Sequence, residues 1–214
     1  VFYAKVANEQ KKVNLEKIYI TIFTKLVRLS GLVFFILSII SQEIYIIVFG
    51  DAWIEAGKYT TFLSFQIFIA FITAPINNLI KIIDKQQYSL IFQFAILILS
   101  VASIIAGGLL SSSIVSISLL SFSTGILTLL FALIVFKLVF ISPIYILKIL
   151  LKEIIYFIPF MIPVLAAKFL LDISNISIIL ISMIIVFTYY IYLFKKDNDL
   201  MQILNQLLKK ISSN

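Results

Sequence analysis

Long stretches without a charged residue dominate the pattern of hydrophobic and polar positions along this chain. No charge occurs in the 22 positions between Lys58 and Lys81, in the 51 between Lys85 and Lys137, or in the 22 between Asp172 and Lys195. A membrane-spanning helix needs about 20 mostly apolar residues, so the 51-residue stretch fits two helices. A turn is expected at residues 107–113, which are rich in glycine and serine. The pattern predicts six spans, over residues 27–49, 59–83, 88–108, 114–137, 154–171 and 173–194.

These spans are predicted to be helices rather than barrel strands. Strands of a membrane barrel alternate apolar and polar residues over about ten positions. Residues 129–136 are instead apolar on every face. In lipid the backbone of such a segment must satisfy its hydrogen bonds internally, which favours a helix. The predicted fold class is an all-α integral membrane protein.

The composition supports a membrane protein and excludes other classes. Of the 214 residues, 62% are hydrophobic and 13% are charged, against about 25% charged in an average soluble domain. Disordered chains need low hydrophobicity, so that class is excluded as well. The chain has no cysteine and no histidine. We therefore expect no disulfide, no metal site of His and Cys ligands, no cofactor and no histidine-based catalysis.

The few charges predict an orientation. With six spans, 15 of the 17 basic residues fall on one side of the membrane and only Lys58 and Lys168 on the other. The positive-inside rule makes the basic side cytoplasmic, and it explains the net charge of +7 without a nucleic-acid partner. The predicted organisation is a cytoplasmic basic segment after a preceding span (1–26), four transmembrane helices (27–137), a cytoplasmic amphipathic connector (138–153), two transmembrane helices (154–194) and a cytoplasmic tail (195–214).

Polar side chains within the predicted spans are candidates for a substrate pathway. Almost none is ionisable, which argues against a proton relay or a dedicated ion site. Lys168 is expected to reach the interface and to pair with Asp172, four residues on. The candidates that remain are Asn77, Asn78 and Gln93. The alternative is a structural role at the membrane interface for the two asparagines and interhelical hydrogen bonding for Gln93.

Proline residues predict helix kinks. Pro75 lies in the second predicted span, and Pro159 and Pro163 lie one turn apart in the fifth. A proline inside a helix removes a backbone hydrogen bond and commonly bends the helix. Such kinks could serve alternating access in a transporter, although they are also common in other membrane bundles.

Three segments resemble one family of membrane proteins. Residues 49–59 match an "FG-x-x-W-x-x-A-x-x-Y" pattern through Phe49, Gly50, Trp53, Ala56 and Tyr59. Residues 1–7 are similar to "V-x-Y-P-x-x-A", with alanine in place of proline, and residues 84–86 are similar to "G-K/R-Q", with aspartate in place of glycine. This order of segments resembles the bacterial polysaccharide biosynthesis proteins, which include the O-antigen flippases of the multidrug/oligosaccharidyl-lipid/polysaccharide exporter superfamily.

The resemblance implies a two-lobed transporter of 12–14 helices in the bacterial cytoplasmic membrane. This chain would be its C-terminal six spans, with both ends cytoplasmic and an N-terminal lobe missing. Its partners would be the bilayer and an undecaprenyl-diphosphate-linked oligosaccharide, and it would not be an enzyme. The 49–59 loop would be structural, with Trp53 as an interfacial anchor. Alternatives are a drug exporter of the same superfamily, a polysaccharide polymerase, which needs larger loops, and a scaffold subunit.

Overall fold

The computed structural model describes residues 2–171, 173–197 and 201, without the side chains of residues 2–15, 77, 78 and 82. The described residues are helical and contain no strand. The elements are α1 (Phe2–Phe49), the short 3₁₀ helix η1 (Asp51–Trp53), α2 (Ile54–Thr73), α3 (Ile76–Ile82), α4 (Gln86–Leu109), α5 (Ser113–Leu138), α6 (Pro143–Phe169) and α7 (Asn175–Lys196). The predicted all-helical class is confirmed.

Five of the described helices are long and apolar enough to cross a membrane. They are residues Glu16–Phe49 of α1 and the whole of α4, α5, α6 and α7. Their length and composition indicate a multi-pass membrane protein. The predicted kink at Pro75 falls where regular helix is interrupted, between the end of α2 at Thr73 and the start of α3 at Ile76. Proline has no N–H to continue the backbone hydrogen bonds of the preceding helix.

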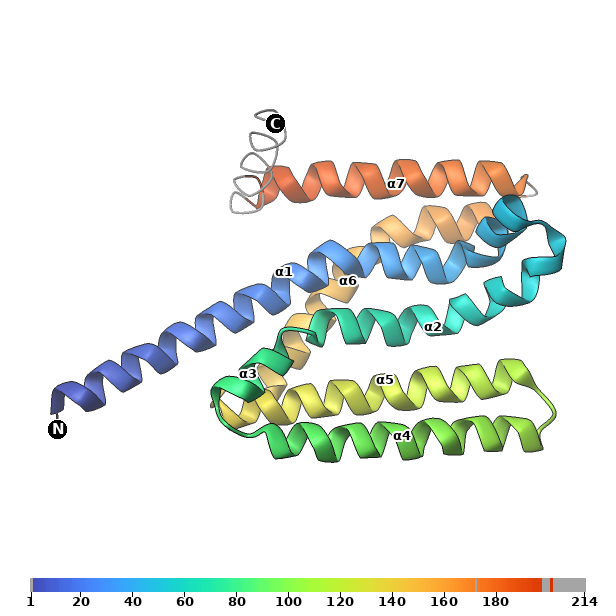
Figure 1. Ribbon diagram of the computed structural model, residues 1–214. Coiled ribbons are helices and arrows are strands. Elements are labelled where there is room, and N and C mark those ends of the chain that lie inside the picture. Colours follow the sequence, from blue (N-terminus) through green and yellow to red (C-terminus); the bar gives the residue numbers. More distant parts are fainter. Residues whose placement is uncertain (1, 172, 198–200, 202–214) are drawn as a thin grey trace, which may run out of the picture.

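The helices α4, α5, α2 and α1 lie side by side in that order (Figure 1). α6 and α7 also pack against α1. α1 is therefore the central helix, in contact with α2, α6 and α7. The first turns of α1 extend beyond the bundle. The fully buried side chains Phe157, Leu32, Ile72 and Val135 come from four of these helices.

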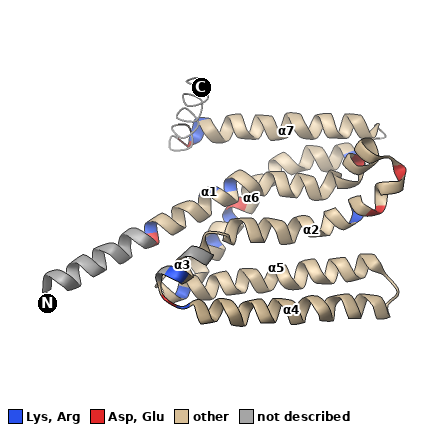
Figure 2. Cartoon of the chain, viewed as in Figure 1, with Lys and Arg blue, Asp and Glu red and all other residues tan. Residues whose placement is uncertain are grey.

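The charges gather at the two ends of the bundle and leave its middle apolar (Figure 2). We call the end where α5 ends and α4 begins the basic end. Ten of the described lysines and arginines lie in the chain segments at this end: Lys17, Lys25, Arg28, Lys81, Lys85, Lys137, Lys148, Lys152, Lys195 and Lys196. Lys58 and Lys168 lie near the opposite end, where η1 joins α1 to α2. This separation matches the split that the hydropathy pattern predicts.

Residues 143–153, expected to belong to a separate amphipathic connector, are the first turns of α6. α6 starts near the basic end of α5, crosses obliquely to α1 and then follows α1 to the opposite end (Figure 1). The structure therefore joins the expected connector and the following span in one helix. Of the expected tail, residues 195–197 and 201 are described, and the remaining tail residues lie outside the described part.

Three helices end in Schellman motifs, in which a residue with positive φ lets two backbone N–H groups reach the last carbonyls. Asp84 after α3, Ser111 after α4 and Phe140 after α5 adopt φ of 52°, 50° and 66°. At Asp84 the two bonds are Asp84 N–H to Lys81 O at 3.3 Å and Lys85 N–H to Ile80 O at 3.1 Å. Glycine is preferred at this position because it has no Cβ to strain. Asp84 also occupies the position where the resembled family carries glycine.

Replacing Asp84 with glycine is therefore expected to stabilise the protein by about 0.5–1 kcal/mol, because the left-handed conformation costs glycine less. Asp84→Val should destabilise it by about 1–2 kcal/mol, since a β-branched residue is strained there. Thermal unfolding in one detergent would measure both changes. A less stable Asp84→Gly protein would contradict the helix ending described here.

The backbones of α1 and α2 approach each other most closely at Gly57. Ser41 of α1 donates a hydrogen bond to the Gly57 carbonyl at 2.8 Å, and its hydroxyl lies 2.7 Å from that of Thr61. A Cβ added at Gly57 would lie 2.6 Å from the Cα of Gln42, which is backbone and cannot move aside easily. Small residues allow such close contacts between membrane helices.

Gly57→Ala is expected to destabilise the α1–α2 pair by about 1–3 kcal/mol through overpacking. Gly108 of α4 offers a matched control, because a Cβ there meets nothing within 4 Å. Gly108→Ala should be neutral or stabilising by up to about 1 kcal/mol, since alanine favours a helix more than glycine does. Unfolding of both variants in detergent separates steric clash from helix propensity. Equal effects of the two substitutions would contradict the close approach at Gly57.

Candidate functional site

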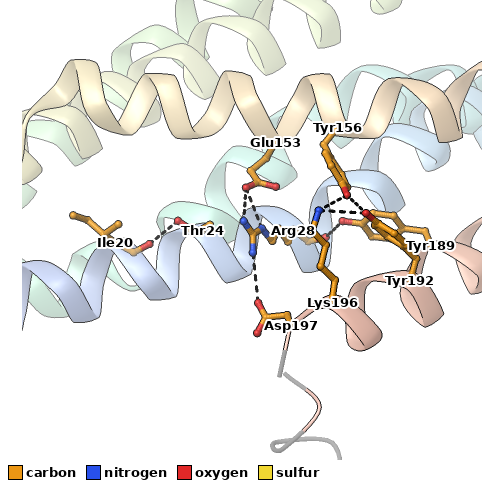
Figure 3. A network of polar contacts seen from close by, with 9 residues as sticks. All are labelled: Ile20, Thr24, Arg28, Glu153, Tyr156, Tyr189, Tyr192, Lys196 and Asp197. Atoms are coloured by element: carbon orange, nitrogen blue, oxygen red, sulfur yellow. Dashed lines mark hydrogen bonds and ion pairs between the residues drawn. The ribbon is translucent and has the colours of Figure 1, made fainter. Parts of the chain in front are cut away.

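A polar cluster joins α1, α6 and α7 at the basic end (Figure 3). Arg28 of α1 stands at its centre. The guanidinium donates from Nε at 3.0 Å and from Nη2 at 2.9 Å to Oε1 of Glu153 on α6. Its Nη1 lies 3.5 Å from Oδ2 of Asp197, which directly follows α7. Glu153 is 5% exposed, so the α6 carboxylate depends on Arg28 for compensation of its charge.

Two tyrosine hydroxyls attach α7 to the backbone of α1 beside this ion pair. Tyr189 donates to the carbonyl of Arg28 at 2.7 Å, and Tyr190 donates to the carbonyl of Leu29 at 2.5 Å. Tyr189 is buried and packs edge-on against the rings of Phe157 and Phe160 of α6. A buried hydroxyl needs such a partner, so these bonds fix where α7 lies along α1.

A lysine held by tyrosines completes the cluster. Lys196 of α7 donates to the hydroxyls of Tyr156 at 2.7 Å and Tyr192 at 3.2 Å, and these two hydroxyls also hydrogen-bond to each other. The ammonium lies 4.7 Å from the centre of the Tyr156 ring and 5.5 Å from that of Tyr192. The cluster surrounds a cavity of about 160 Å³, which Lys152 also lines.

A second ion pair joins α1 to α6 near the opposite end of the bundle. Lys168 Nζ lies 2.9 Å from Oε1 of Glu43, and it also donates to the carbonyl of Ile39. The Glu43 and Lys168 side chains are only 10% and 15% exposed. The expectation that the spans hold no buried charge is therefore wrong. Lys168 pairs with Glu43 across the helix contact, while Asp172, its expected partner, lies outside the described residues.

The two ion pairs share one register. Arg28 and Glu153 are 125 residues apart in the chain, and so are Glu43 and Lys168. α1 and α6 therefore run in the same direction, with the order of positive and negative charge reversed between them. On each helix the two charges are 15 residues apart, which is about 22 Å along the axis. The pairs thus delimit an apolar stretch slightly shorter than the hydrocarbon core of a bilayer, which is about 30 Å thick.

Of the predicted pathway residues, Gln93 lines a different cavity. It is exposed on α4 at a cavity of about 190 Å³ between α2, α4 and α5, with the hydroxyl residues Thr73 and Thr128 also in its lining. Asn77 and Asn78 belong to α3, but their side chains lie outside the described part of the structure. The structure therefore gives Gln93 a cavity and leaves its relation to the two asparagines untested.

The prolines of α6 do not interrupt it. Pro159 and Pro163 lie inside the continuous helix and are both exposed, away from the α1 contact. Their missing N–H groups leave the carbonyls of residues 155 and 159 without their usual helical donors. Of the three prolines for which a kink is predicted, Pro75 alone stands at an interruption of regular helix, between α2 and α3.

The residues of the family-like loop form the tight connection between α1 and α2. Phe49 ends α1, and its ring centre lies 5.3 Å from that of Trp53 in η1. Gly50, with φ of 90°, makes the turn between them. Tyr59 donates to Ser113 at 2.9 Å and so connects the loop to the start of α5, while the carbonyl of Ala56 accepts from Thr60. Trp53 and Phe49 are half exposed at this end of the bundle.

The arrangement offers groups that can bind a ligand. Within the described residues, no group of three His, Cys, Asp or Glu side chains could hold a metal ion. The polar cluster presents ammonium and hydroxyl donors at the basic end, which is suited to an anion. Comparisons with protein-family models, with curated proteins and with solved structures found no match for this chain.

The sequence analysis missed both ion pairs because it treated each charge as belonging to one span or loop. One signal was present in the sequence. Arg28 and Glu43 flank one apolar segment, and Glu153 and Lys168 flank another of the same length in the opposite order. Equal spacing and complementary order are what a parallel pair of helices needs to match its charges in register.

Proposed function

We propose that this chain is part of a membrane transporter that moves a lipid-linked oligosaccharide across the bacterial cytoplasmic membrane for surface polysaccharide synthesis. The chain forms a helical bundle that belongs to one lobe of a two-lobed, 12–14-helix protein, and its N-terminal lobe supplies the other side of the substrate cavity. The basic end faces the cytoplasm, in keeping with the positive-inside rule.

One observation carries the proposal. The three family-like segments follow the family order, and two of them fall at junctions between helices. Residues 49–59 include the connection from α1 to α2, and residues 84–86 include the connection from α3 to α4. The family-like glycine position is occupied by Asp84, whose φ of 52° is the conformation that favours glycine. The local geometry therefore supports the match at the position where the sequence departs from it.

The shape of the described bundle agrees with a transporter lobe. An apolar groove of about 840 Å³ lies between α1 and α7, which leaves one face of these helices unpartnered within the described chain. The described connections between helices at the end opposite the basic end are short, whereas a polymerase needs larger loops to carry its catalytic residues.

Deletion of the gene in its bacterial host tests this function. We expect lipid-linked repeat units to accumulate on the cytoplasmic leaflet, where externally added glycosidases or lectins cannot reach them, and surface polysaccharide to be lost. Complementation with the intact gene should restore both. Normal surface polysaccharide in the deletion strain would overturn the proposal.

A drug exporter of the same superfamily is the second candidate, and the buried Glu43 favours it more than the sequence alone does, since a membrane carboxylate can serve ion coupling. The two functions differ in the deletion strain. An exporter predicts sensitivity to cationic or amphipathic toxins with unchanged surface polysaccharide, which is the reverse of the flippase result.

A further inference from the structure

The α6–α7 hairpin carries a group of lysine and tyrosine side chains at the basic end that can donate hydrogen bonds to an anion. The two carboxylates of the polar cluster, Glu153 and Asp197, are both engaged by Arg28. Among the described residues, neither Lys152 nor Lys196 makes an ion pair with a carboxylate. Within the described residues, the lining of the cavity thus carries three cationic side chains against two carboxylates, an excess of one positive charge.

Two tyrosine hydroxyls hold the Lys196 ammonium in place. Tyr156 and Tyr192 come from facing turns of α6 and α7, and their rings stack with centres 6.0 Å apart. Both hydroxyls and the Lys196 ammonium hydrogen-bond to one another (Figure 3), and all three residues line the cavity. Lys152 is one helical turn from Tyr156 on α6 and lines the same cavity. Phosphate oxygens accept hydrogen bonds from such ammonium and hydroxyl donors.

The surface next to the cavity is suited to acyl chains. Along α6, toward the middle of the bundle, the exposed side chains include the apolar residues Ile155, Ile158 and Ile162. Tyrosine and lysine near the end of such a helix mark the depth of lipid headgroups. Basic pockets between transmembrane helices bind the headgroups of anionic lipids.

We propose that the α6–α7 hairpin binds one anionic phospholipid of the surrounding bilayer, with its phosphate between Lys152, Lys196 and the hydroxyls of Tyr156 and Tyr192 and its acyl chains along the exposed apolar side chains of α6. The site does not depend on the proposed transport function. It would fix the end of α7 against α6 at the level of the Arg28 cluster.

The test uses the protein in nanodiscs of equimolar phosphatidylglycerol and phosphatidylcholine, with native mass spectrometry counting the lipids that remain bound after release. We expect one retained phosphatidylglycerol. Lys152→Gln/Lys196→Gln should reduce its retention at least tenfold, because each lysine contributes substantially to attraction for an anionic lipid. Tyr156→Phe/Tyr192→Phe keeps every charge and should reduce retention about threefold.

The matched control is Lys81→Gln/Lys85→Gln, which removes the same charge from the basic end but lies beside α3 and α4. It should leave the retained lipid in place, and 10 mM inorganic phosphate should not displace it. An equal loss in the control variant would show diffuse charge attraction and overturn the site. Unchanged retention in the tyrosine variant, which leaves the Arg28 ion pairs intact, would also overturn it, and so would displacement by free phosphate.

Discussion

Substitution of Lys168 by methionine is expected to destabilise the protein by about 3–5 kcal/mol. The change leaves Glu43 buried and without its partner, and an uncompensated buried charge is costly. The double variant Glu43→Leu/Lys168→Met should recover most of the loss, because well-packed apolar residues often replace a buried ion pair at little cost. The double variant is therefore expected to be more stable than the single Lys168→Met protein. Unfolding by a titration with sodium dodecyl sulfate in mixed micelles would measure all three.

An exposed ion pair of the same end provides the control for this cycle. Lys58 and Glu55 lie 2.7 Å apart, but their side chains are 37% and 50% exposed. Lys58→Met should change the stability by less than about 1 kcal/mol, since solvent screens such pairs. If Lys58→Met and Lys168→Met lower the free energy of unfolding equally, burial is not the reason for the cost of breaking the Glu43–Lys168 pair.

Substitution at Arg28 is expected to have the second large effect, because one guanidinium serves two carboxylates on two other helices. Arg28→Met leaves both Glu153 and Asp197 without this partner and should cost about 3–5 kcal/mol. Arg28→Lys should cost less, about 1–2 kcal/mol, because an ammonium lacks the planar fork that reaches both carboxylates. In the same detergent titration the unsubstituted protein should be the most stable, Arg28→Lys less stable and Arg28→Met the least stable.

The Arg28 variants should also change the position of α7. The chain contains no cysteine, so spin labels can be placed at the exposed residues Ile22 of α1 and Ile191 of α7 without removing native thiols. We expect a broader distance distribution in Arg28→Met than in the unsubstituted protein. A narrow, unchanged distribution would mean that the Tyr189 and Tyr190 bonds to α1 hold α7 without the arginine.

The helical class and the separation of charge could be predicted because both depend on local composition. Apolar segments of about 20 residues can satisfy their backbone in lipid only as helices. The break at Pro75 was predicted as a kink within one span. Whether a proline bends or ends a helix depends on the following turn, and here α3 is only seven residues long before the Schellman motif at Asp84.

The candidate site could not be derived from any single segment. Arg28, Glu153 and Asp197 come from three helices far apart in the chain, and their meeting depends on which helices pack together. A hydropathy pattern assigns each segment to the membrane but does not choose its neighbours. Tyr156 and Tyr192 were likewise unremarkable as isolated aromatic residues, and their role follows only from the antiparallel contact of α6 with α7.

The matched register of α1 and α6 has a consequence for how this chain can change in length. One residue inserted between positions 28 and 43, or between 153 and 168, would rotate everything beyond it by about 100° and advance it by about 1.5 Å, which separates one of the two ion pairs. A residue added in the α4–α5 turn disturbs neither interval. We therefore expect insertions and deletions to be tolerated in the connections but not within the two 15-residue intervals, whose lengths must stay equal for both ion pairs to form.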